Sequence, residues 1–195
     1  MGTQRKVSQM DPKSQIDQAR IQTLIDRQDI MDCLIRFSRG IDRFDRELFL
    51  SAFHPDATIA AGPFVGGPAD LCDWSFAMHQ DYQILTQHDL LNHSCEIDGD
   101  TAHCETYYLF VARNRDESAM LAGGRYVDRV ERRDGQWKIA LRTNAIEWSV
   151  APTSVPLPFG DLPGIDLNGT SERSRADISY IRPLVNHRAP FVPGA

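Results

Sequence analysis

The chain of 195 residues is long enough to bury one hydrophobic core, so we expect a single domain. Its composition, 42% hydrophobic and 25% charged, is that of an ordinary globular protein, and no apolar run approaches the roughly 18 residues that a membrane span needs. A net charge of −6 with scattered arginines argues against binding to nucleic acid. The first residues lack the apolar stretch of a signal peptide, so we expect a cytoplasmic protein with no membrane partner.

The first expected element is a long helix that follows a loose tail. Residues 1–13 are polar and show no period, which is typical of a poorly ordered chain end. Between residues 14 and 39 apolar side chains recur at helical spacing, and Ser14 with Asp17 three residues on resembles a capping box. Gly40 follows where a C-cap glycine belongs, so we expect the helix to end there.

Two shorter helices and one short strand are expected next. The helices cover residues 45–53 and 69–82, and the strand covers residues 58–61. A stretch rich in glycine and proline, residues 62–68, separates the strand from the third helix and predicts a loop.

The period of the apolar residues changes from helical to alternating at Thr86. Four strand-like segments follow, at residues 86–97, 101–113, 121–133 and 136–148. Two Asp-Gly turns and one polar link join them, which predicts a meander of four long antiparallel strands.

Proline and glycine dominate from residue 151 onward, so residues 151–195 cannot continue the sheet. We expect an extension that docks on the same or a neighbouring subunit through its apolar side chains. These side chains are Phe159, Leu162, Tyr180, Ile181, Leu184 and Phe191.

Helices that precede long antiparallel strands indicate an α+β domain, in which the helices cover one face of the sheet. For residues 14–150 we expect a cone-shaped, strongly curved antiparallel (mixed) sheet, with three N-terminal helices enclosing a pocket. Such a pocket suits a hydrophobic small-molecule ligand.

Alternation along each strand predicts which side chains face this pocket. In the second strand the inner candidates are Ala102, Cys104, Thr106, Tyr108, Phe110 and Ala112. In the third strand they are Ala122, Gly124, Tyr126 and Asp128. In the fourth strand Arg142 and Asn144 share one face, and Leu141 and Thr143 share the other. Alternation alone does not predict which of these faces is the inner one.

The stretch TQHDLLNH, residues 86–93, carries two histidines on the first long strand. Alternation places His88 and Asn92 on one face and His93 on the other, so one histidine points inward whichever face is buried. A lone histidine on a strand is more often structural than catalytic. The same caution applies to Asp42, because an aspartate just past a helix end usually caps a turn.

The four cysteines, Cys33, Cys72, Cys95 and Cys104, lie in apolar-patterned segments and show no CxxC spacing. This pattern argues against a zinc site and against a disulfide scaffold. We expect four buried thiols.

A set of short motifs follows in a fixed order between residues 16 and 148. They are Gly40-Ile41-Asp42, His54-Pro55-Asp56-Ala57, Thr86-Gln87-His88 with Asn92, Glu96-Ile97-Asp98-Gly99-Asp100, and the segment from Tyr126 to Lys138. Together they resemble the SnoaL-like branch of the nuclear transport factor 2-like superfamily. Within that branch the chain looks most like the group of scytalone dehydratase, hexachlorocyclohexane dehydrochlorinase and bile-acid dehydratase.

The resemblance implies a dyad of Asp42 and His88 inside the cone, with His93 on the opposite face. It also implies a homodimer or homotrimer and needs no cofactor or metal. The side chains expected to contact substrate are Arg142, Asn144, Tyr108, Tyr126, Asn92, Phe110 and Phe37. The sequence departs from its relatives at Phe37, where the dehydrochlorinase has a lysine, and at Ile41 and Ala61, where the scytalone enzyme has tyrosines, so the resemblance does not carry over the substrate.

A neutral imidazole can accept a proton near pH 7, and a carboxylate on its other nitrogen fixes the tautomer. We therefore hypothesise a lyase or isomerase in which His88 removes a proton from a hydrophobic, cyclic molecule. Two alternatives stay open: a pocket that only binds a ligand or forms oligomer contacts, and an isomerase or epoxide hydrolase in which Asp42 itself is the base.

Overall fold

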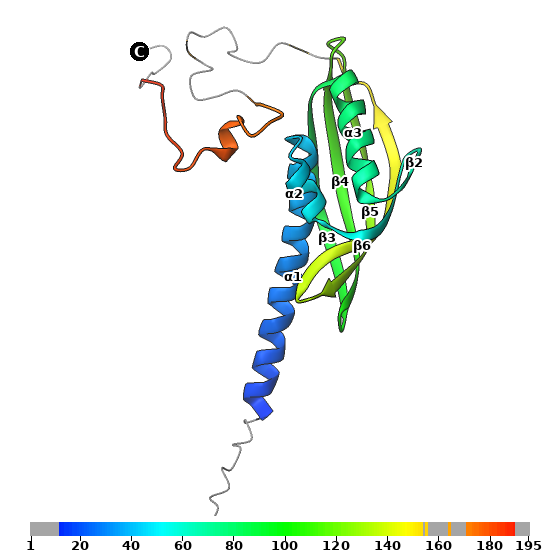
Figure 1. Ribbon diagram of the computed structural model, residues 1–195, viewed down its shortest axis with the longest axis vertical. Helices are drawn as coiled ribbons and strands as arrows, with labels where there is room; N and C mark the ends of the chain where they lie inside the picture. Colours follow the sequence, from blue (N-terminus) through cyan, green and yellow to red (C-terminus); the bar gives the residue numbers. More distant parts are fainter. Residues whose placement is uncertain (1–11, 154, 156–163, 165–170, 190–195) are drawn as a thin grey trace, which may run out of the picture.

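The computed structural model describes residues 12–153, 155, 164 and 171–189 (Figure 1). Its α-helices are α1 (Pro12–Asp42), α2 (Arg46–Ser51) and α3 (Pro68–Tyr82). Its strands are β1 (Phe53–Ala61), β2 (Phe64–Gly66), β3 (Gln83–Asp98), β4 (Thr101–Asn114), β5 (Ala119–Arg133) and β6 (Gln136–Val150). A 3₁₀ turn, η1 (Ile178–Tyr180), lies in the C-terminal extension.

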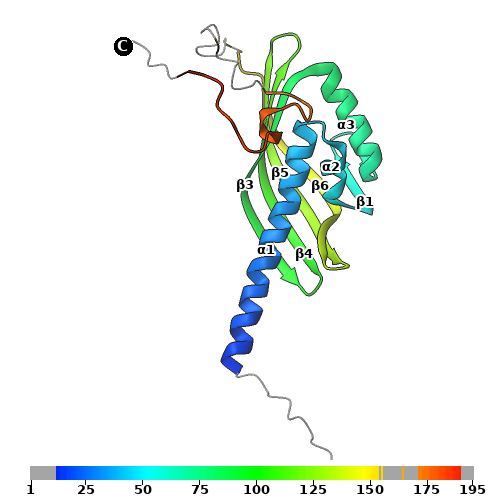
Figure 2. The same cartoon turned by 60° about the vertical axis from the view of Figure 1, so that its left-hand side comes forward.

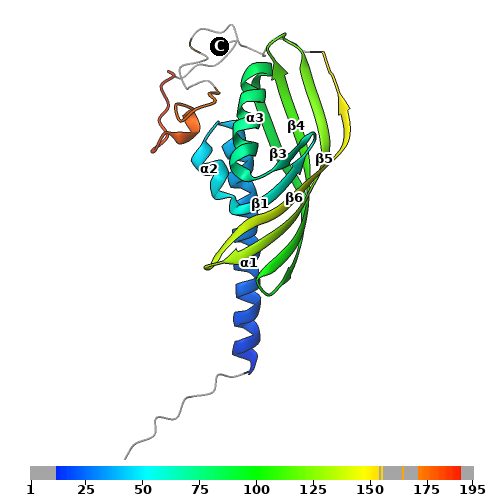
Figure 3. The same ribbon diagram turned by 45° about the vertical axis from the view of Figure 1, so that its right-hand side comes forward.

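The strands form one curved sheet with the order β2-β1-β6-β5-β4-β3. The meander from β3 to β6 is antiparallel throughout, and β1 pairs with β6 in parallel, so the expected α+β fold with a curved, mixed sheet is confirmed. The three helices lie on the same side of this sheet, over its concave face (Figure 3). The short strand β2 lies where a plain loop was expected, and it pairs with β1.

Helix α1 is longer than expected at both ends, because it begins at Pro12 and continues through Gly40 to Asp42. Gly40 is therefore not a C-cap. A Cβ at this position would lie 2.5 Å from the backbone nitrogen of Phe49 and 2.7 Å from its Cα. Gly40 thus permits α2 to cross α1 in close contact, which the Gly40-Ile41-Asp42 motif alone does not reveal.

The hydrophobic core lies between α1 and the concave face of the sheet. The largest fully buried apolar side chains come from both layers, and they are Ile30, Leu34, Phe49, Ile59, Val130 and Ile139. All four cysteines are buried free thiols, as expected. None of the helices in the described part of the chain is both long and apolar enough to cross a membrane.

The inner faces of β4 and β5 are those that alternation predicts. All six β4 side chains named above are buried, and so are the four on β5. In β6, where alternation did not choose, Arg142 is buried whereas Leu141 and Thr143 are exposed.

Strand β3 departs from simple alternation because it contains a bulge. Leu90 pairs with Tyr108, and His93 pairs with Thr106, so β3 uses three steps where β4 uses two. Beyond the bulge the faces exchange. His93 therefore turns to the inner face and Asn92 is exposed. This corrects two expectations, that Asn92 shares a face with His88 and that His93 lies on the opposite face.

The described part of the C-terminal extension packs against its own chain, at the junction of α1 and α2 (Figure 2). The Tyr180 hydroxyl donates to a carboxylate oxygen of Asp45 at 2.8 Å, and the guanidinium of Arg39 lies 4.5 Å from the centre of the Tyr180 ring. Of the other side chains expected to dock, Ile181 and Leu184 are exposed. Phe159, Leu162 and Phe191 lie outside the described residues.

The contact at Gly40 yields a test of the fold. In Gly40→Ala the new methyl group meets backbone atoms of α2 that cannot rotate away, so we expect a loss of about 1–3 kcal/mol in the free energy of unfolding. The matched control is Gly67→Ala, since a Cβ at Gly67 meets nothing within 4 Å. Urea denaturation measures both variants; equal stabilities would contradict the close crossing of α1 and α2.

Candidate active site

A cavity of about 250 Å³ lies between the helices and the concave face of the sheet. Most of its wall is apolar and comes from α1, α3 and the strands. Representative lining residues are Phe37, Ile59, Leu71, Trp74, Phe110 and Met120. Polar side chains at a few points of this wall, described below, give the cavity its chemical character.

The first polar group is a dyad of Asp42 and His88. Asp42 is the last residue of α1, and one oxygen, Oδ1, lies 2.7 Å from His88 Nδ1. The same oxygen accepts a hydrogen bond from the Thr86 hydroxyl at 2.9 Å. The second oxygen, Oδ2, accepts one from the backbone N–H of His88 at 2.9 Å. The two residues that the resemblance pairs are therefore within hydrogen-bond distance, and the Asp42 carboxylate is held by three donors.

This geometry sets the tautomer of His88. A carboxylate oxygen can only accept, so the proton of the neutral ring is on Nδ1 and the lone pair is on Nε2. Within the described residues Nε2 has no hydrogen-bond partner, and the ring forms part of the cavity wall. The Phe110 ring centre lies 4.8 Å from that of His88 and packs the imidazole in place.

A second polar group is the buried pair of Arg142 and Asp128. Two hydrogen bonds of 2.7 Å join the guanidinium to both carboxylate oxygens, and each residue is 1% exposed. The guanidinium lies against the rings of both Phe37 and Tyr126, with its carbon 4.3 and 4.2 Å from their centres. Arg142 Nη1 is buried and finds no acceptor in the described part of the chain. Arg142 therefore brings one free donor to the wall, while Asp128 neutralises its charge.

The third polar group combines two tyrosines with Asn144. The rings of Tyr108 and Tyr126 stack with centres 4.4 Å apart, and both residues line the cavity. Burial raises the pKa of both tyrosines, and a hydrogen bond from Asn144 partly offsets this for Tyr108. Asn144 Oδ1 is buried and unpartnered among the residues described.

His79 is a site residue that the sequence analysis missed. It lies in the last turn of α3, is 4% exposed, lines the cavity, and has its ring centre 5.7 Å from that of His88. Its Nδ1 is 2.9 Å from Gln83 Oε1, so Nδ1 carries the proton. Burial, and next the neighbouring His88, lower the pKa of His79 to about 4. The available signal was the spacing of Leu71, Ser75 and His79, which places them on one helix face.

Arg173, from the C-terminal extension, also approaches the dyad. Its Nη1 donates to the backbone carbonyls of His79 and Gln83 at 2.8 and 2.9 Å, and its guanidinium lies over the Phe44 ring. Burial lowers the pKa of Arg173 to about 10, and the charge of Asp42 opposes this shift. No spacing in the sequence connects this arginine to residues about 90 positions earlier.

Asn92 is the one expected substrate contact that does not line the cavity, because the bulge in β3 turns it to the exposed face. The other expected contacts, Arg142, Asn144, Tyr108, Tyr126, Phe110 and Phe37, all do. The side chains of His93, Cys95 and Cys104 form a separate cluster with the donor types of a metal site, and they do not line the cavity.

Solved structures with the same fold include proteins of named and of unknown function. A hexachlorocyclohexane dehydrochlorinase (LinA) type 2 is similar with a TM-score of 0.66 and 21% identity over 75% of this chain and 99% of that one. A protein from Novosphingobium aromaticivorans provisionally described as a scytalone dehydratase has a TM-score of 0.60 and 20% identity over 71% and 95%. A protein from Nostoc punctiforme with a cystatin-like fold and unknown function has a TM-score of 0.51 and 22% identity over 63% and 92%. At these identities the likeness establishes the fold alone.

A search of curated proteins found no match. The sequence model of the SnoaL-like domain family matches residues 22–143. This range is more than half of the chain and includes both members of the dyad. The chain therefore belongs to the SnoaL-like domain family.

Proposed function

We propose that this protein is a cofactor-independent lyase, of the dehydratase or dehydrohalogenase kind, or an isomerase, and that His88 is its general base. The observation that carries the proposal is the clamp on His88: Asp42 fixes the proton on Nδ1 and leaves the Nε2 lone pair without a partner at the wall of an apolar cavity. A neutral imidazole so oriented can accept a proton at physiological pH.

The cavity indicates the substrate class. An apolar cavity of about 150 Å³ is large enough for benzene, and the cavity here measures about 250 Å³. It therefore suits a substituted ring or a small fused ring system. The unpartnered Arg142 Nη1 and Asn144 Oδ1 offer this molecule one donor and one acceptor, so its ring would carry oxygen or halogen substituents.

The reaction proposed is a proton transfer coupled to loss of a leaving group. His88 Nε2 takes a proton from a ring carbon, the electron pair of that C–H bond forms a double bond, and the bond from the neighbouring carbon to its substituent breaks. A hydroxyl leaves as water after taking the proton back from the His88 imidazolium, whereas a chloride leaves without it. Asp42 stabilises the imidazolium, and Arg142 Nη1 or a tyrosine hydroxyl binds the oxygen that gains charge.

The hydrogen bonds of Asp42 favour this arrangement over one in which Asp42 is the base. Both of its oxygens accept from β3, and Oδ1 accepts twice. Removing a substrate proton with this carboxylate would break at least one of these bonds. The remaining alternative is a pocket that binds the same class of ligand and does not convert it. The expected homodimer or homotrimer remains a prediction.

The first test is turnover by dyad variants. A screen of hydroxylated and halogenated cyclic compounds identifies a ligand that the protein converts. On that substrate we expect His88→Ala and Asp42→Asn to lower kcat by about 100-fold or more, because one removes the base and the other removes the group that orients it. KM should change only a few-fold, since the apolar wall remains. Product formation followed by chromatography measures both constants.

The matched control is His103→Ala, because His103 is an exposed histidine on the outer face of β4. It should retain wild-type turnover. Full activity in both dyad variants would overturn the assignment of His88 as the base. Ligands that bind tightly and are never converted would instead support the binding-only alternative.

His79 extends the proposal, because it provides a second polar atom beside His88. With Nδ1 donating to Gln83, its Nε2 is an acceptor, and its low pKa keeps the ring neutral at pH 7. A neutral acceptor at this position can orient a substrate hydroxyl without competing with His88 for its proton.

The low pKa of His79 makes stability depend on pH. In the unfolded chain a histidine binds a proton below about pH 6.5, whereas folded His79 stays neutral down to about pH 4. Since the unfolded state binds more protons in this window, the contribution of His79 to stability is complete above pH 6.5 and is lost as the pH falls toward 4. The loss amounts to about 2–3 kcal/mol.

We expect His79→Gln to lack this component. Urea unfolding at pH 7 and at pH 4.5 should show a smaller difference in the free energy of unfolding for the variant than for the wild type. The exposed His103→Gln should behave like the wild type. An unchanged pH dependence in His79→Gln would show that His79 is not a buried neutral histidine.

A further inference from the structure

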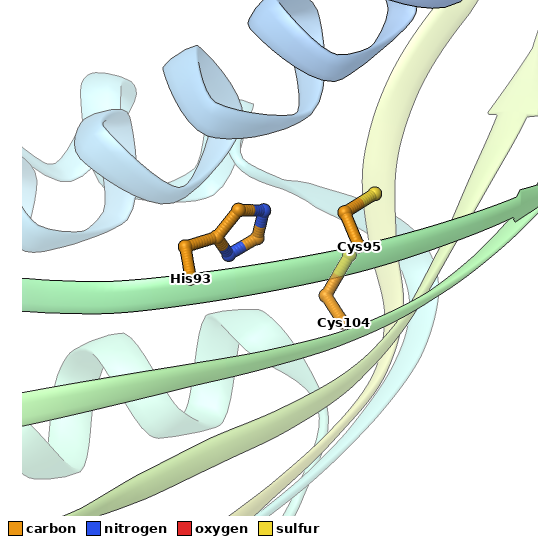
Figure 4. Close-up of side chains that lie close together, drawn as sticks. All are labelled: His93, Cys95 and Cys104. Carbon is orange, nitrogen blue, oxygen red and sulfur yellow. The ribbon is translucent and has the colours of Figure 1, made fainter.

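The bulge in β3 assembles a cluster of side chains outside the proposed active site. It turns His93 to the inner face, next to Cys95, and the strand register places Cys95 directly opposite Cys104 on β4 (Figure 4). One nitrogen of His93 and the two sulfur atoms all lie within 4.8 Å of one another. His93 and Cys95, two residues apart, share a face in any regular strand, and the bulge before them turns that face inward.

The hydrogen bonding of His93 leaves one ring nitrogen free. Nδ1 lies 2.8 Å from the Thr106 hydroxyl oxygen, whereas Nε2 is buried and has no hydrogen-bond partner among the described residues. Buried polar atoms are nearly always paired. If Nδ1 donates to Thr106, Nε2 carries a lone pair, and this is the second-sphere arrangement that orients histidine ligands toward metal ions. In Figure 4 the ring nitrogen farther from the backbone points toward Cys95.

The two thiols supply the remaining donors. Cys95 is 5% exposed, Cys104 is fully buried, and both are free. One imidazole nitrogen and two thiolates form a soft donor set, which suits zinc or cuprous copper and does not suit magnesium or calcium. Ligand atoms around a tetrahedral zinc ion, with bonds of about 2.0–2.3 Å, lie closer than about 4 Å to one another. The three atoms, now within 4.8 Å of one another, would therefore have to move slightly closer together when the ion binds.

We propose that His93, Cys95 and Cys104 form a binding site for one thiolate-seeking metal ion, zinc or cuprous copper. Binding exchanges the protons of the two thiols for the cation and releases them to solvent. His93 is the most exposed of the three residues, so the ion enters, and a water molecule can complete the coordination, on the His93 side.

The position of the cluster indicates a structural role for the ion. None of the three residues lines the 250 Å³ cavity. Arg27 of α1 donates to the backbone carbonyl of Cys95 at 2.8 Å, so the cluster lies where α1 crosses β3. A bound ion would join β3 just after its bulge to β4 and hold the register on which the inner faces of both strands depend. This inference does not rest on the proposed lyase activity.

The test uses the reduced full-length chain after treatment with a chelator. Titration with Zn²⁺ against a colorimetric competitor, and with Cu⁺ under nitrogen, should show one ion per chain for at least one of the metals. Substitution with Co²⁺ should give the ultraviolet charge-transfer band of cobalt–thiolate bonds. Loss of a ligand in His93→Ala, Cys95→Ser or Cys104→Ser should weaken metal binding by more than about 100-fold. Thr106→Val removes the hydroxyl that orients His93 and should weaken metal binding by about 10-fold.

The matched control is Cys72→Ala, because Cys72 is an equally buried thiol on α3 that is not part of the cluster. It should bind the metal as the wild type does. Metal should also raise the melting temperature of the wild type and of Cys72→Ala by about 5 °C or more and leave that of Cys95→Ser unchanged, which distinguishes a lost site from a lost fold.

Three results would overturn the proposal. The first is absence of stoichiometric binding of either metal by the reduced chain. The second is equal loss of binding in Cys72→Ala and in the cluster variants. The third is a disulfide between Cys95 and Cys104 in freshly purified protein, seen as a mass 2 Da lower than that of the reduced chain, which would make the pair a redox couple and not a ligand pair.

Discussion

The carboxylate of Asp42 connects the two layers of this protein at the point where the proposed chemistry takes place. It is the last residue of α1, and its three hydrogen bonds all come from β3, two from side chains and one from the backbone. A buried carboxylate is costly unless such donors are present. The end of α1 and the start of β3 are thus fixed relative to each other, and the tautomer of His88 follows from the same contacts.

The contacts around the turn between α1 and α2 help to hold the Asp42 carboxylate in position. Gly40 allows α2 to cross α1 directly after it, and Asp45 caps α2 by accepting from the Leu48 N–H. Tyr180 of the extension and Arg175 then donate to Asp45. The extension is therefore linked to the dyad through the turn between α1 and α2. Truncating it would remove contacts to this turn as well as Arg173, which covers the end of α3.

Some polar atoms of the cavity wall are paired with each other, and others have no partner among the described residues. Arg142 and Asp128 satisfy each other, which allows both to be buried without a net charge. Arg142 Nη1 and Asn144 Oδ1 are the exceptions, and both residues belong to the cavity wall. Because unpaired buried atoms are rare, we propose that these two atoms and His88 Nε2 make the polar contacts with a ligand.

The periodicity of apolar residues along the chain predicted the secondary structure and most of the inward-facing side chains. The helices, the four long strands and the inner faces of β4 and β5 follow from periodicity, and Asp42 and His88 follow from motifs that the family shares. The faces on which Asn92 and His93 lie depend on the bulge in β3. Alternation could not predict this bulge, because the extra residue has no sequence signature. His79, Arg173 and the pair of Cys95 with Cys104 come together through tertiary packing and strand register. Spacing along the chain indicated at most that His79 shares a helix face with Leu71 and Ser75, and it could not pair two cysteines that lie on different strands.

The central claim is that Asp42 fixes the ring proton of His88 on Nδ1 and leaves the Nε2 lone pair toward the cavity. Nitrogen-15 NMR of the histidine side chains at pH 7.5 to 8 tests it most directly, with the His88 signals assigned by their loss in His88→Ala. The account predicts a protonated Nδ1 and an unprotonated Nε2 for His88 in the wild type, and a change in this pattern in Asp42→Asn. A proton on Nε2 in the wild type, or an Asp42→Asn spectrum identical to it, would contradict the account.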